Sequence, residues 1–172
     1  MKNISINIVG IGTESYPSGT TPLEIISSTK GIPKDTIICK VNDVLTDLSA
    51  PINSDVTLKF LDGKSKDGHS VLLHSTAHLM AQAVKRLHPK TKVTIGPYLE
   101  NRFYYDFDVE TPFTEEDLLN IEKEMLKISE ENLDIVYEIK SREDAIKFFK
   151  KIGEDYKVEI INDLDKSEVL KV

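Results

Sequence analysis

Two histidines four residues apart, His74 and His78, are the side chains of this sequence best suited to chemistry. In a helix, residues at this spacing lie one above the other on the same face. Imidazole titrates near neutral pH and can contact a metal ion, a water molecule or a polar substrate. The pair therefore predicts joint contact with one of these ligands, with a purely structural role in the helix as the alternative.

The segment that must position this pair, residues 71–87, has the apolar periodicity of a helix. Its apolar stripe recurs at spacings of three and four residues and consists of Leu73, Ala77, Met80, Val84 and Leu87. Each histidine of the pair follows a stripe residue by one position, which places it about 100° from the buried seam. We expect the pair to line a cleft, and we expect His69 and His88 to lie exposed near the helix ends.

Length and composition predict a globular protein with a real core, in one domain or two small ones. The chain has 172 residues, of which 40% are hydrophobic and 30% charged. Its net charge of −7 argues against a general nucleic-acid coat but allows a local basic site. A single cysteine, Cys39, excludes an internal disulfide framework, and no signal-peptide core or membrane-spanning run is present. We expect a soluble, cytoplasmic protein without membrane contact.

The first sixty residues predict a small α+β roll with one helix across a mixed sheet. Residues 1–16 alternate polar and apolar side chains around two glycines, as in a β-hairpin. A short helix over residues 23–28 is expected after Thr21, which is a candidate N-cap followed by Pro22 and Glu24. Short strands are expected over residues 37–46 and 56–60.

The remaining residues predict a second α+β unit. The polar, glycine-containing segment 62–68 is interpreted as the domain boundary. Strands are expected at residues 93–97 and 103–108 around a Gly-Pro turn, and a helix is expected after the N-cap candidate Thr114. A strand at 135–139, a Ser141-capped helix at 145–149 and a strand at 156–161 follow. The tail, residues 165–172, is expected to carry no closing element.

Five short segments of the second half occur in the order and at the spacings of a known family. They are residues 74–79, 95–97, 103–107, 112–118 and 156–158. In these segments the chain resembles the N-terminal editing domain of bacterial-type threonyl-tRNA synthetases. The first sixty residues resemble the TGS module, a ubiquitin-like β-grasp domain, through their strand order and Lys40-Val41-Asn42. The resemblance implies a TGS domain at 1–62 and a partial editing domain at 63–172.

The resemblance implies proofreading, the hydrolysis of mischarged seryl-tRNA(Thr), and it assigns four catalytic residues. His74 and His78 would position the water and the leaving group, Lys157 would stabilise negative charge, and Tyr105 would orient the substrate through its hydroxyl. A solvated strand face is the alternative for Lys157. Tyr104 and Tyr105 are expected on opposite faces of a strand, and the sequence does not decide which of them faces the pocket.

The resemblance also implies binding residues. Gly96 would let the backbone approach the substrate closely, and Asp106 is assigned to substrate binding, with a surface role as its alternative. The compact basic run at residues 85–92 would contact phosphates of the tRNA(Thr) acceptor stem. Its candidate RNA-binding residues are Lys85, Arg86, Lys90 and Lys92. The alternative for this run is complementing the dipole at the helix C-terminus.

The sequence departs from the family pattern at several points. The family's pocket is completed by a Cys-x-x-x-His motif beyond residues 156–158, and this motif is absent here, as are the catalytic core and the anticodon-binding domain. Arg102 stands where the family usually has glycine. No third ligand joins the histidine pair, so no metal and no cofactor are expected. Full-length family members are homodimers.

Two other functions are possible interpretations. One is a non-catalytic module that binds tRNA or a protein partner. The other is the N-terminal region of a nucleoside kinase with similar leading domains, but no phosphate-binding Gly-x-x-x-x-Gly-Lys loop occurs. Loss of the His74 imidazole distinguishes an editing domain from a binding module, because only the former would lose activity.

Overall fold

The structure, a computed structural model, describes residues 2–96, 98–99, 101–136 and 138–172. It divides into two compact units, Met1–Leu73 and His74–Val172. Together they have the α+β character expected from the sequence. The division falls inside helix α2 (Lys66–Leu87), not at the polar segment 62–68. No helix in the described ranges has the length and apolar character needed to cross a membrane.

The first unit contains the mixed sheet that the sequence predicts. Its strands are β1 (Asn3–Ile8), β2 (Gly12–Pro17), β3 (Thr36–Val41), β4 (Val44–Thr46) and β5 (Val56–Asp62). They are ordered β2-β1-β5-β3-β4, with β1 parallel to β5 and antiparallel to β2. The alternation of Ile4, Ile6 and Ile8 places all three on the buried face of β1.

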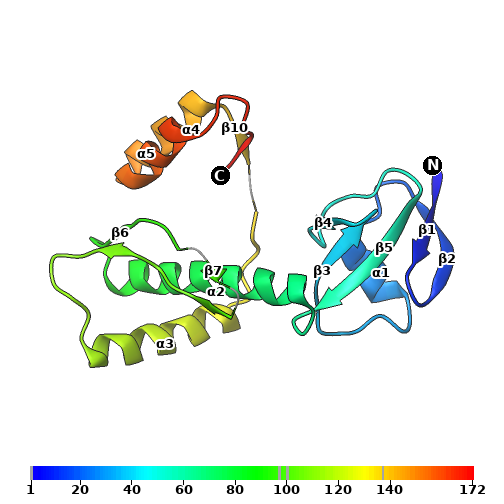
Figure 1. Ribbon diagram of the computed structural model, residues 1–172, viewed down its shortest axis with the longest axis horizontal. Helices are drawn as coiled ribbons and strands as arrows, with labels where there is room; N and C mark the ends of the chain where they lie inside the picture. The colour runs from blue at the N-terminus through cyan, green and yellow to red at the C-terminus, as the bar shows by residue number, and fades with distance from the viewer. Residues whose placement is uncertain (1, 97, 100, 137) are drawn as a thin grey trace. The chain divides into compact units, whose positions relative to one another are not determined.

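Helix α1 (Pro22–Ser28) lies against this sheet (Figure 1). It begins with the expected capping box, in which the Thr21 hydroxyl accepts from the Glu24 N–H and the Glu24 carboxylate accepts from the Thr21 N–H. Ile25 of α1 is fully buried among the β1 isoleucines, Cys39 and Leu58. The cap and one apolar side chain therefore fix the helix on the sheet.

Helix α2 begins earlier than the expected residue 71, because the polar segment before it supplies a cap. The Ser65 hydroxyl accepts from the Gly68 N–H at 3.1 Å and donates to the Asp62 carbonyl at 2.7 Å. A Cβ at Gly68 would lie 1.9 Å from that carbonyl oxygen, so only glycine fits. These residues form a helix start within the first unit.

In the second unit, α2 packs against α3 (Glu115–Glu130), and the two helices lie side by side (Figure 1). Their buried contacts come from Ala83 and Val84 of α2 and from Ile121 and Ile128 of α3. The predicted N-cap Thr114 forms a full capping box with Asp117 at the start of α3. Of the expected α2 stripe, Ala77 and Val84 are fully buried, whereas Leu87 is exposed.

Two short strand pairs lie between α2 and α3 in the chain. β6 (Lys92–Val93) pairs with β9 (Phe107–Asp108), and β7 (Tyr98–Leu99) pairs with β8 (Arg102–Phe103), both antiparallel. The expected strands 93–97 and 103–108 are therefore shorter than predicted but do pair with one another. Pro97 of the expected Gly-Pro turn lies outside the described residues.

The C-terminal part contains α4 (Arg142–Lys151) and α5 (Asp155–Asp163), which run side by side (Figure 1). The predicted Ser141 cap of α4 is confirmed. The Arg142 guanidinium donates to the carbonyls of Ile161, Leu164 and Asp165, so α4 satisfies carbonyls at the end of α5.

Three sequence predictions are wrong in this part. Residues 156–161 form helix α5 instead of a strand, because the buried side chains are Val158 and Ile161, at the i, i+3 spacing of a helix. The tail carries strand β11 (Leu170–Lys171), which pairs with β10 (Ile139–Lys140). The expected strand 135–139 is reduced to β10, and Ile135 and Val136 before it are exposed.

Candidate active site

The histidine pair lies on the exposed side of α2, as expected, and its two rings are in contact. The Nε2 atoms of His74 and His78 are 3.0 Å apart, and the rings meet edge to face. One nitrogen must donate and the other accept, so the two facing atoms hold a single proton between them. Partial burial, the neighbouring His74 and the charge of Lys157 together lower the pKa of His78. His78 is therefore suited to accept a proton at neutral pH.

Lys157 lies in the first turn of α5, and its charge acts on His78. Its half-buried ammonium donates to the Thr94 carbonyl at 3.4 Å, next to β6. Burial lowers the pKa of Lys157, and the carboxylate of Glu154 partly opposes that effect. Since the Lys157 charge influences His78, the fold brings together residues from α2 and α5 that are far apart in the sequence.

Tyr105, and not Tyr104, is the partly buried tyrosine of the pair that the sequence left open. Its ring stacks on Phe107, with centroids 5.0 Å apart. A Cβ at Gly96 would lie 2.1 Å from Cδ2 of Tyr105, so the ring rests directly on the Gly96 backbone. Gly96 thus allows close approach of the Tyr105 ring in this structure, and its approach to a substrate stays a prediction. Burial, and secondarily the charge of Glu154, raise the pKa of Tyr105 and keep its hydroxyl protonated.

Asp106 has an exposed side chain, and its backbone holds the strands in place. Its carbonyl accepts from both the N–H and the hydroxyl of Thr94, and its N–H donates to the Ile95 carbonyl. Asp108 accepts a hydrogen bond from the Tyr156 hydroxyl at 3.1 Å, which links β9 to α5.

Glu154 is a charged residue near the site that sequence reasoning missed. It is 8% exposed, and its carboxylate forms an ion pair with Lys85 at 2.8 Å. Its charge acts on both Tyr105 and Lys157. The only available signal was its position just before the Tyr156-Lys157 segment, since surface acids are common in this sequence.

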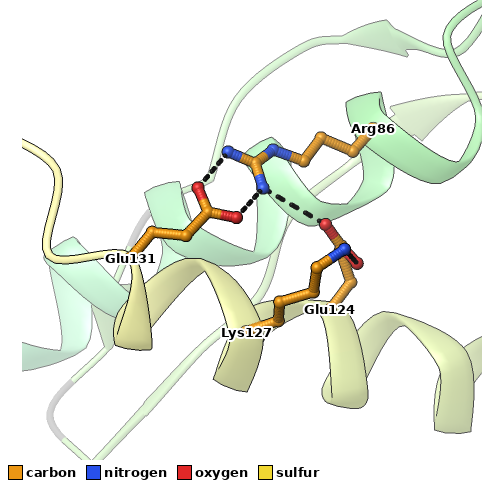
Figure 2. Close-up of polar contacts among 4 residues, drawn as sticks. All are labelled: Arg86, Glu124, Lys127 and Glu131. Carbon is orange, nitrogen blue, oxygen red and sulfur yellow. Dashed lines mark hydrogen bonds and ion pairs between the residues drawn. The ribbon is translucent and has the colours of Figure 1, made fainter.

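The basic run at residues 85–92 is largely engaged within the unit. Arg86 forms a bidentate pair with Glu131, at 2.6 and 2.8 Å, and also contacts Glu124 of α3 (Figure 2). Lys85 pairs with Glu154, and Lys92 pairs with Asp155 at 2.9 Å. Three of the four predicted RNA-binding cations thus form ion pairs with carboxylates of the protein. The fourth, Lys90, is exposed.

The last residues of this run line a groove of about 750 Å³, separate from the histidine pair. It contains His88, Lys90 and Lys92 together with the acids Asp108 and Asp117, so its charge is mixed. Among the residues that the structure describes, no group of three or more His, Cys, Asp or Glu side chains could hold a metal ion.

A histidine biased towards its neutral form, a half-buried ammonium and a partly buried tyrosine are groups that can take part in acid–base chemistry. Comparison with known proteins gives this chemistry a context. No family model matches the chain. Threonine–tRNA ligases of Anoxybacillus flavithermus and Symbiobacterium thermophilum are each 45% identical to it, over 160 and 158 residues. That of Clostridium novyi is 49% identical over 137 residues.

These matches cover 92%, 91% and 80% of the chain but only 25%, 24% and 22% of the relatives. The chain therefore spans about a quarter of the length of the curated relatives that it matches. The class that they define is the aminoacyl-tRNA synthetases. Over this quarter of their length the chain is similar to threonine–tRNA ligases, which confirms the resemblance at the level of this enzyme.

Proposed function

We propose that the second unit hydrolyses seryl-tRNA(Thr), the proofreading reaction of a threonine–tRNA ligase. The observation that carries this proposal is the contact of His74 with His78, whose Nε2 atoms are 3.0 Å apart, together with the electrostatic effect of Lys157 on His78. These are the residues to which the family resemblance assigns catalysis. The likeness to threonine–tRNA ligases is consistent with these assignments.

A threonine-activating enzyme needs such a reaction because serine lacks only one methyl group. The missing methyl contacts discriminate by only about 1–3 kcal/mol, so serine is attached to tRNA at an appreciable rate. A second site must bind the seryl ester, exclude the extra methyl of threonine and direct water at the ester carbonyl.

The residues of the second unit supply the required groups. Neutral His78 accepts a proton from the attacking water, and the Lys157 ammonium stabilises the oxyanion that forms on the ester carbonyl. His74, joined to His78 through their Nε2 atoms, delivers a proton to the departing ribose oxygen. The protonated Tyr105 hydroxyl donates a hydrogen bond that orients the substrate.

We further infer that tRNA(Thr) is the partner and that the first unit is a TGS module. The strand order β2-β1-β5-β3-β4, with one helix on the sheet, supports a β-grasp fold for this unit. Lys90, which is exposed at the end of α2, is the cation of the basic run best placed to contact a phosphate.

The test is deacylation of seryl-tRNA(Thr) by the full chain and by the His74→Ala variant. Loss of the imidazole should slow hydrolysis by about 10²–10⁴-fold, the usual contribution of a positioned acid or base. His88→Ala is the matched control, because His88 contacts Asp117 and Phe113 instead of the pair. Equal rates for the wild type and His74→Ala would reject the proposal and leave a binding role.

A further inference from the structure

Glu154 occupies an unusual position for a carboxylate in this protein. It is the N-cap residue of α5, yet its side chain makes no capping hydrogen bond. It is buried and directed instead to Lys85, whose ammonium also donates to the carbonyls of Pro89 and Thr91. Glu154 thus joins the first turn of α5 to the C-terminal turn of α2 and to the loop that follows it.

The second carboxylate oxygen of Glu154 increases the free-energy cost of burying this side chain. Within the described part of the chain, Oε2 is the buried side-chain atom without a hydrogen-bond partner. A buried acceptor without a partner is unfavourable, and desolvation offsets much of the attraction within a buried ion pair. A buried carboxylate in this position calls for an explanation beyond its ion pair.

The same carboxylate is electrostatically coupled to the candidate site. The backbone carbonyl of Glu154 accepts a hydrogen bond from the Lys157 N–H at 3.1 Å, so the two residues share one turn. Its negative charge favours the ammonium form of Lys157 and the neutral hydroxyl of Tyr105. These are the protonation states that charge stabilisation and hydrogen-bond donation require.

We propose that Glu154 is a positioning residue for Lys157: its buried carboxylate fixes the first turn of α5, which carries Lys157, to α2 through Lys85. The consequence for hydrolysis rests on the proposed function. The placement and charge state of Lys157 do not rest on it and can be measured separately.

The experiment is an NMR titration of the Lys157 side chain and the Tyr105 ring in the full chain and in Glu154→Gln. Glutamine keeps the shape and removes the charge, so the pKa of both Lys157 and Tyr105 should fall. The matched control is Asp155→Asn, which removes the neighbouring carboxylate and its pair with Lys92. The control should leave both values unchanged. Unchanged values in Glu154→Gln would overturn the proposal.

Deacylation of seryl-tRNA(Thr) by the same variants gives the second readout. Glu154→Gln should lower kcat by tenfold or more with little change in KM, while Asp155→Asn retains wild-type rates. A shift in the Lys157 titration without hydrolysis by any protein would support the positioning role and reject the proposed function. If Glu154→Gln does not fold, the Lys85→Gln/Glu154→Gln double variant removes both charges and allows the same titration.

Discussion

His78 can act as a base only if its neutral form predominates at working pH. Partial burial favours that form, and the positive charge of Lys157 adds to the effect, so the pKa of His78 lies below its ordinary value of 6.5. The state of this single imidazole thus depends on a residue of another helix. The motif residues were predictable from the sequence, but this dependence was not, because it requires the distance between α2 and α5.

Removing the Lys157 charge should raise the pKa of His78. In Lys157→Met the repulsion between the ammonium and a protonated imidazole disappears, so protonation of His78 becomes easier. An NMR titration of the imidazole signals measures the change, with Lys90→Met as a control that removes an exposed cation of the same unit. A His78 pKa that stays the same in Lys157→Met would contradict the electrostatic effect of Lys157 on this imidazole.

Gly96→Ala should destabilise the second unit by about 1–3 kcal/mol, the usual cost of overpacking. The new methyl group would meet the Tyr105 ring at 2.1 Å and force it off the Gly96 backbone. Urea unfolding measures the loss. In a Tyr105→Ala background the ring is absent, so the same substitution should cost much less. An equal cost in both backgrounds would show that the ring is not the obstacle.

At the scale of elements, helix starts were the most predictable features. Thr21, Thr114 and Ser141 all cap helices as expected, because a capping pattern is a local signal of a few residues. Helix α5 was not predicted, since Tyr156, Val158 and Ile160 also alternate as in a strand. Burial of Val158 and Ile161 favours the helical period over the strand period. This burial depends on tertiary packing, which a local sequence pattern does not show.

Thr114→Ala should lower the free energy of unfolding by about 0.5–2 kcal/mol, as loss of an N-cap does. The Asp117 N–H would lose its side-chain acceptor, and the reciprocal hydrogen bond, which the Thr114 N–H donates to the Asp117 carboxylate, would be weakened. Urea unfolding followed by circular dichroism measures the change. Thr111→Ala, at a nearby exposed threonine, should have little effect; a similar loss there would count against the cap.

At the scale of the whole molecule, two units with separate cores make up a chain with a net charge of −7. The sequence predicted two units but placed their division before α2, because polar glycine-containing segments usually mark linkers. It also assigned RNA contact to Lys85, Arg86 and Lys92, whose carboxylate partners come from distant parts of the sequence. Partners of this kind cannot be read from a local run of charge.

The central claim is selective hydrolysis of the seryl ester by the second unit. The most direct test compares single-turnover hydrolysis of seryl-tRNA(Thr) and threonyl-tRNA(Thr) by the 172-residue chain. We predict faster hydrolysis of the seryl ester, with the difference abolished in His74→Ala. Background rates for both esters, in a protein that circular dichroism shows to be folded, would contradict the account.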